Sequence, residues 1–292
     1  MKRKSFSCNR FYNLRHELET DYHEDYEYAN AVAYGEINSI EKTDNNVLKV
    51  LTKRFSGNGV LEQYEVSISY PDGDIDSSDH SSFIGSWFDE MPESNPAEVS
   101  FDCCVFEAPI SLKGYRSIRF QNCFFLDSVS IEDCPECRMI SFEHCVFKDD
   151  LTISKCQSDN LFIRNCNNLQ SLMMDDCVVG KWTSIHDVYV KMAFFIWNSV
   201  FSGHEYTFHR VKIGYGLEVL GCVFESPAEM SLCRLEEMRV RNCTFNQLNV
   251  HDIFTNRYLE CEELVRPSNE SACPGDCESC DDPYCNLTPR ER

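Results

Sequence analysis

Long apolar runs are missing from this 292-residue chain. No stretch approaches the roughly 18 uninterrupted apolar residues of a membrane-spanning helix, so we expect none. The basic start at residues 1–6 is not followed by the roughly 7–15 apolar residues of a secretory signal, so we expect a cytoplasmic protein. Positive charge is also scarce: 27 Lys and Arg stand against 48 Asp and Glu, a net charge of −21. This balance argues against direct binding to nucleic-acid backbones.

Cysteine, in contrast, is abundant, with 18 residues. In a protein without an export signal, cysteines indicate thiols or metal ligands rather than a disulfide framework. Hydrophobic residues make up 42% of the chain and aromatic residues 12%, which is enough for a substantial core. The chain as a whole is therefore expected to fold.

The cysteines mark an internal repeat. From Cys123 to Cys177 they recur at steps of 11, 11, 11, 10 and 11 residues, and similar steps, with one shortened step of 8, define fifteen anchor positions. The anchors are Cys104, Tyr115, Cys123, Cys134, Cys145, Cys156, Cys166, Cys177, Val188, Ser199, Val211, Cys222, Cys233, Cys243 and Ile253. Three and five residues before the anchors the side chains are apolar, with Thr183 the only clear lapse. We expect both columns, and the cysteines, to be buried.

The alternation before each anchor predicts a short strand, and a polar residue directly before it, such as Asn122 or Asn165, predicts a corner. Two residues after successive anchors, large apolar and polar residues alternate: Phe106, Ser117, Phe125, Glu136, Phe147 and Ser158. One coil therefore contains two units, about 22 residues. The sequence predicts a mainly β protein in which residues 99–256 form a parallel β-helix, or solenoid, of about seven coils.

A small anchor followed two positions later by a large side chain recurs in Cys123-Phe124-Phe125, Cys145-Val146-Phe147, Cys222-Val223-Phe224 and Cys243-Thr244-Phe245. This pattern resembles that of the pentapeptide-repeat proteins, and the resemblance implies a right-handed, four-sided β-helix. The inserted eleventh residue and the missing Asp/Asn-Leu signature depart from that family. A leucine-rich repeat is the alternative, because residues 161–166 fit its core motif, but such repeats carry one strand per 20 or more residues. Here both halves of the coil carry the strand pattern.

The flanks lack the repeat. In residues 1–98 the acidic, aromatic run 22–28 indicates a solvated helix face or a loop, and residues 31–40, 47–52 and 64–70 are strand-like. We expect a small β-rich module or cap, joined to the first coil by a loop over residues 72–98. Residues 257–292 form an acidic, cysteine-rich tail. Both flanks are suited to covering the ends of a solenoid.

The tail carries four cysteines in thirteen residues: Cys273, Cys277, Cys280 and Cys285. Their spacing suits a thiolate metal site, most simply zinc. The alternative is an acidic tail with spare or disulfide-linked cysteines. The first three also match the iron–sulfur spacing of radical-SAM enzymes, although the βα-barrel pattern of those enzymes is absent.

No carboxylate pair or nucleophile–base set stands out, and His186, His209 and His251 are expected to be isolated surface residues. We therefore expect a non-enzymatic scaffold that binds another protein or a second copy of itself. The residues directly after the anchors point outward and form two apolar columns: Val178, Val200 and Val223, and on the other side Val105, Phe124 and Val146. We expect a flanking module to cover one column and a partner to contact the other. An acidic DNA mimic and a carbohydrate-binding or carbohydrate-active β-helix are the alternatives.

Overall fold

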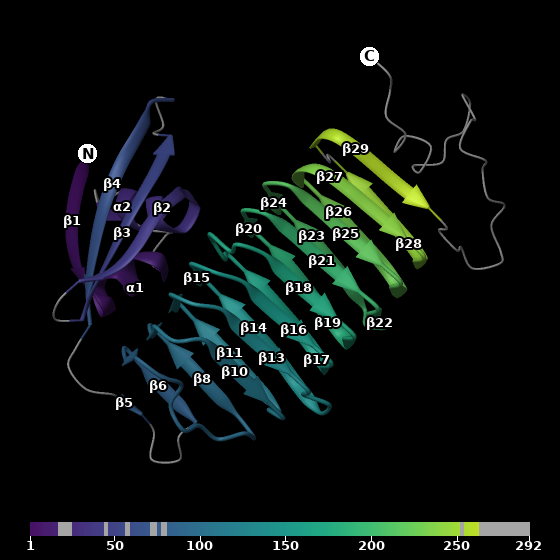
Figure 1. Ribbon diagram of the computed structural model, residues 1–292, viewed down its shortest axis with the longest axis horizontal. Helices are drawn as coiled ribbons and strands as arrows, with labels where there is room; N and C mark the ends of the chain where they lie inside the picture. Colours follow the sequence, from purple (N-terminus) through teal and green to yellow (C-terminus); the bar gives the residue numbers. More distant parts are fainter. Residues whose placement is uncertain are drawn as a thin grey trace.

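The computed structural model describes residues 1–16, 25–43, 46–55, 59–70, 75–76, 81–251 and 254–262. They form an N-terminal module and a long parallel β-solenoid whose first half lies beside that module (Figure 1). The predicted fold class is confirmed: the chain is mainly β, and the solenoid has about eight turns. Within the described part, no helix is long and apolar enough to cross a membrane.

The N-terminal module is a four-stranded sheet in the order β1-β4-β3-β2 with two helices. Its elements are β1 (Lys2–Ser7), α1 (Cys8–His16), α2 (Asp25–Tyr34), β2 (Glu36–Thr43), β3 (Val47–Phe55) and β4 (Leu61–Ser69). The prediction of a strand over residues 31–40 was wrong for its first part, because α2 continues to Tyr34. Gly35 ends that helix where a Cβ would lie 2.2 Å from the Ala31 carbonyl oxygen, so no larger residue fits.

The solenoid is built from three groups of parallel strands. The largest sheet contains β5 (Ile75–Asp76), β6 (Ser82–Ile84), β8 (Val99–Asp102), β11 (Ser117–Gln121), β14 (Cys137–Glu143), β17 (Gln157–Arg164), β19 (Val178–His186), β22 (Val200–Phe201), β23 (Glu205–His209), β26 (Val223–Ser231) and β28 (Thr244–His251). A ten-stranded sheet contains β10 (Ile110–Lys113), β13 (Val129–Glu132), β16 (Leu151–Ser154), β18 (Leu172–Asp175), β20 (Tyr189–Val190), β21 (Ala193–Trp197), β24 (Lys212–Ile213), β25 (Gly216–Leu220), β27 (Arg234–Arg241) and β29 (Phe254–Glu262). A short sheet contains β7 (Trp87–Phe88), β9 (Val105–Phe106), β12 (Phe124–Phe125) and β15 (Val146–Phe147).

The register confirms the 22-residue coil. Ile118 pairs with Val99 on one side and with Ile140 on the other, and Phe125 pairs with Phe106 and Phe147. The solenoid is longer than predicted at both ends. Strand β6 already pairs in parallel with β8 within residues expected to be a loop, and β29 pairs with β27 beyond residue 256. The early coil escaped prediction because Ser86, and not cysteine, occupies its anchor position.

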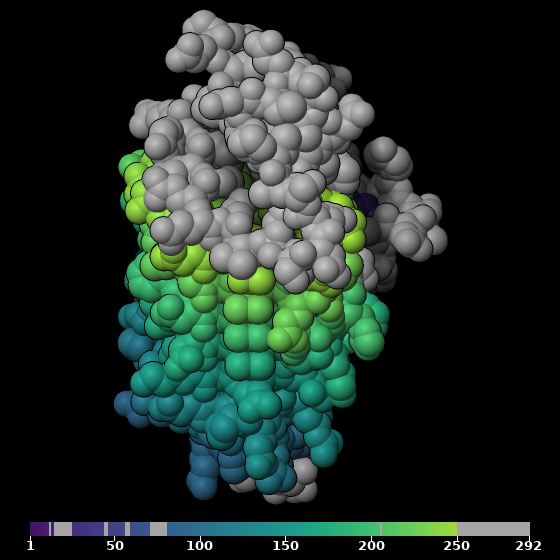
Figure 2. Space-filling model, turned by 90° about the vertical axis from the view of Figure 1, so that its right-hand side faces the viewer, coloured from purple at the N-terminus to yellow at the C-terminus, as the bar shows by residue number. Residues whose placement is uncertain are grey.

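The interior is a dry stack of equivalent side chains, as the two apolar columns predicted. Phenylalanines stack face to face on successive coils: the ring centroids of Phe106 and Phe125 are 5.3 Å apart, and those of Phe125 and Phe147 are 4.7 Å apart. On the other side, Phe224 and Phe245 stack at 4.6 Å. Outside, residues at equivalent positions form continuous columns along the solenoid (Figure 2). Each outer column is therefore a surface that changes character only when the residue type changes.

The corners before the anchors adopt left-handed backbone, as the asparagines predicted. Asn122, Asn165, Asn198 and Asn242 have φ values between 49° and 55°, and Gly221 has φ 65°. Asparagine and glycine enter this region at low cost. The same corners hold Lys155, Asp187, Arg210 and Leu232, also at positive φ, so the coil imposes the conformation regardless of the residue.

Thr183, the lapse in the apolar column, is a weak point of the interior. It pairs with Leu161 and Tyr206, only 2% of its surface is exposed, and its hydroxyl has no hydrogen-bond partner. A buried hydroxyl without a partner costs about 1–3 kcal/mol. We expect Thr183→Val to raise the free energy of unfolding by about 1 kcal/mol, measured by urea denaturation.

Ser199 provides the matched control for this substitution. It is buried at an anchor position, but its hydroxyl donates to the Trp197 carbonyl at 2.7 Å and accepts from the Cys177 amide at 3.1 Å. Ser199→Ala should therefore lower stability, since it leaves a buried amide unpaired. Destabilisation by Thr183→Val would contradict the assignment of an unsatisfied hydroxyl.

Candidate functional site

The outer column Val105, Phe124 and Val146 is covered by the N-terminal module. These residues are 0%, 1% and 0% exposed and share one hydrophobic cluster with Phe6 and Phe11 of the module. The Phe11 and Phe124 rings lie 6.4 Å apart. The expectation that a flanking module covers one of the two columns is confirmed. A solenoid column of this kind is thus already used as a docking surface within the chain.

Asn167 continues the same column and fixes the edge of the module. Its Nδ2 donates to the carbonyl oxygens of Val32 at 2.9 Å and of Gly35 at 3.0 Å, at the carboxyl end of α2. These carbonyls belong to the last turn of a helix, which lacks partners of its own. Asn167 is 2% exposed, so the contact is buried and directional. Beyond it the column becomes polar and emerges from the module.

The second outer column is stacked as predicted. Val178 pairs with Val200, and Val200 pairs with Val223. Val178 is 36% exposed, and the other two are partly exposed. The column is bounded by Gln157 before it and Thr244 after it. Three valines on successive coils therefore present an apolar strip between polar ends.

The ladder cysteines are reduced and buried among the described residues. Burial raises the pKa of the Cys177 and Cys233 thiols to about 11, and that of Cys123 well above its usual range. In the pair Cys134 and Cys156, the hydrogen bond between the thiols lowers the pKa of the first and raises that of the second. Raised pKa values and burial keep thiols unreactive, so the ladder serves packing.

Serine at an anchor is better tolerated than the sequence suggests. A buried hydroxyl there would be costly if it had no partner, but Ser199 donates to the carbonyl two residues earlier, as the Cys145 thiol does toward Glu143 at 3.4 Å. The coil backbone supplies an acceptor at each anchor of this kind. The ladder is thus not specific to sulfur.

The tail cysteines Cys273, Cys277, Cys280 and Cys285 lie outside the described residues. Within the described residues, no group of three or more His, Cys, Asp and Glu side chains could hold a metal ion. The zinc site therefore stays a prediction from spacing alone.

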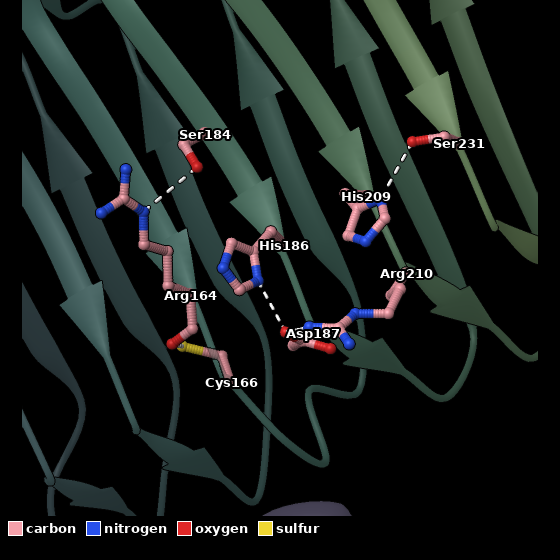
Figure 3. Close-up of polar contacts among 8 residues, drawn as sticks. All are labelled: Arg164, Cys166, Ser184, His186, Asp187, His209, Arg210 and Ser231. Carbon is pink, nitrogen blue, oxygen red and sulfur yellow. Dashed lines mark hydrogen bonds and ion pairs between the residues drawn. The ribbon is translucent and has the colours of Figure 1, made fainter. Parts of the chain in front are cut away.

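A polar cluster lies where the large sheet turns toward the N-terminal module (Figure 3). His186 Nδ1 is 2.7 Å from Asp187 Oδ2, and Arg210 reaches the same oxygen at 2.5 Å. On the next coil, His209 Nδ1 is 2.9 Å from the Ser231 hydroxyl. An acid–imidazole pair and an imidazole–hydroxyl pair are present, but on different histidines. This arrangement does not form the relay from carboxylate through one imidazole to a nucleophile.

A cleft of about 160 Å³ opens beside this cluster, between the end of α2 and the solenoid. Its module side is formed by Tyr34, Gly35 and Glu36, and its solenoid side includes Asn167, Asp187, Tyr189, Arg210 and Lys212. Lys212 lies over the Tyr189 ring, with Nζ 4.4 Å from the centroid. Lys191, at the side of Tyr189, is partly buried and its Nζ donates to the Ile37 carbonyl at 3.4 Å.

The comparisons with known proteins give no relative. No family model matches the chain, and no curated protein or solved structure is similar to it. The resemblance to pentapeptide-repeat proteins is therefore supported only at the level of a β-solenoid with coils of about 22 residues.

The sequence reasoning missed the cleft. Its signal is a change along one column: after Val105, Phe124 and Val146 the equivalent positions hold Asn167, Tyr189, Lys212 and Arg234. A switch from apolar to polar in one column marks the edge of what covers it. That the cover comes from α2 was not visible, because the contact joins residues 135 positions apart.

Proposed function

We propose that the protein is a non-enzymatic scaffold that binds another protein, or a second copy of itself, through outer columns of the solenoid. The observation that carries the proposal is the use of one such column within the chain. The N-terminal module docks on Val105, Phe124 and Val146, and the column of Val178, Val200 and Val223 repeats that chemistry. Contiguous apolar surface of this kind is typical of interaction sites.

The test is the double substitution Val200→Lys with Val223→Lys. Both side chains point away from the core, so the fold should be kept while the docking surface is lost. We expect the variant to lose self-association, measured by light scattering after gel filtration, or to lose the partners that the unmodified protein retains in a quantitative pull-down read by mass spectrometry.

The matched control places two lysines on outward positions of another face, Ser111→Lys with Thr152→Lys. It adds the same charge and should keep the mass and the partner set. If the valine double variant behaves like this control in both measurements, the column is an ordinary strand surface and the proposal fails.

The two alternatives have less support. A DNA mimic needs a continuous row of acids, but the outer column of the large sheet mixes its charges: Gln121, Glu143, Arg164, His186, His209 and Ser231. For carbohydrate binding, one feature is suitable. Phe195 and Trp197 lie side by side outside the ten-stranded sheet, and Trp197 Nε1 donates to Glu218 at 3.0 Å. That aromatic pair belongs to one strand, so it offers a small platform.

A further inference from the structure

The cleft at the end of α2 lies in a basic part of an acidic protein. Lys212 and Arg234 occupy equivalent positions on neighbouring coils and pair directly in the sheet, and both are exposed. Within the described part of the chain, neither has a carboxylate at ion-pair distance. Elsewhere on the surface lysines are neutralised, as Lys113 is by Glu132 at 2.9 Å and Lys181 is by Asp159 at 2.8 Å.

The acids of the cleft do not balance these charges. The Asp187 carboxylate is already shared by Arg210 and His186. On the opposite rim, Glu36 is exposed and is the remaining carboxylate of the lining. Lys191, Lys212 and Arg234 therefore leave an excess of positive charge. A concave site lined by one sign of charge attracts ligands of the other sign.

The walls of the cleft are held in place on both sides. Asn167 joins the end of α2 to the solenoid through its two hydrogen bonds, and the strands β20 and β24 pair beneath Tyr189 and Lys212. The spacing of cations is set by the coils, about 4.8 Å from one strand to the next. A row of cations at this spacing matches carboxylates along an extended peptide, whose residues rise about 3.3 Å each.

We propose that this cleft and the basic row beside it bind an acidic peptide segment of a protein partner. Carboxylates of the segment would pair with Lys212 and Arg234, and Tyr189 and the exposed Tyr34 offer aromatic surface for its stem atoms. The inference rests on the proposed role as a binding scaffold but does not depend on the valine column.

The experiment uses the full chain and a fluorescein-labelled decapeptide of alternating Asp and Glu, followed by fluorescence anisotropy. The Asn/Gln counterpart of that peptide is the uncharged probe. We expect binding of the acidic peptide alone, weakened at least tenfold by Lys212→Gln with Arg234→Gln and strengthened by Glu36→Gln. The matched control, Lys148→Gln with Lys155→Gln, removes two exposed positive charges from other positions and should change affinity less than twofold.

Several results would overturn the proposal: no binding of the acidic peptide, equal binding of its uncharged counterpart, or equal losses in the two double variants. Binding of inorganic phosphate without binding of the acidic peptide would replace it by a phosphate site. Val200→Lys with Val223→Lys should leave the peptide affinity unchanged. The failure of one proposal can thus be told apart from the failure of the other.

Discussion

Phe124→Lys should release the N-terminal module from the solenoid while the coils stay folded. Phe124 is 1% exposed, and it is buried by the module and not by the solenoid core. Loss of a buried phenylalanine costs about 3–5 kcal/mol, and a buried ammonium without a partner adds to that cost. Because the module completes its own core with Val105, Phe124 and Val146, we expect its sheet to lose protection when they separate.

Hydrogen exchange read by mass spectrometry measures this directly. Peptides from β3 and β4 should exchange at least tenfold faster in the variant, whereas peptides from β16 and β17 should keep their protection. Alkylation of Cys8, a thiol buried in the module, should accelerate in parallel.

Tyr189→Lys is the matched control, since it places the same side chain in the same outer column beyond the module's main contact. The coil accepts lysine there, because Lys212 occupies the next position in the native chain. This variant should leave exchange in β3 and β4 unchanged. Equal exposure of the module in both variants, or unfolding of the coils by Phe124→Lys, would contradict the assignment of Phe124 to the docking surface.

The solenoid was predictable because its determinants are local and repeated. Burial of both apolar columns, the left-handed corners and the 22-residue coil all follow from alternation and spacing that recur in each unit. Even the covered column was visible as a row of outward Val and Phe. The repeat failed only where its residue types changed, as at Ser86, which let the first coil escape notice.

The N-terminal module and the cleft were not predictable in the same way. In residues 29–34 alanine, valine and tyrosine fit a strand or a helix equally well, and packing on the sheet decides for the helix. The cleft depends on where that helix ends relative to Asn167, a contact between distant parts of the chain. Single-sequence patterns contain no information on such a meeting. They do contain the change from Val146 to Asn167 that marks it.

Phe125→Ala should be among the most destabilising single changes in the solenoid. The ring is fully buried and stacked between Phe106 and Phe147, so truncation leaves a cavity that both neighbours line. We expect a loss of about 3–5 kcal/mol in the free energy of unfolding, measured by urea denaturation followed by circular dichroism. Phe195→Ala is the control, because that ring lies partly exposed on the outside of β21 and its loss should cost about 1 kcal/mol or less.

Pairs of such substitutions test whether the coils interact only with their neighbours, as in other solenoids. Phe125→Ala with Phe224→Ala should give additive losses, because these rings stack in separate ladders on distant coils. Phe125→Ala with Phe147→Ala should cost less than the sum, since each substitution alone already removes the contact that the two rings share. Additive losses in the adjacent pair would show that the rings contribute only by burial, and that stacking along the ladder adds no stability of its own.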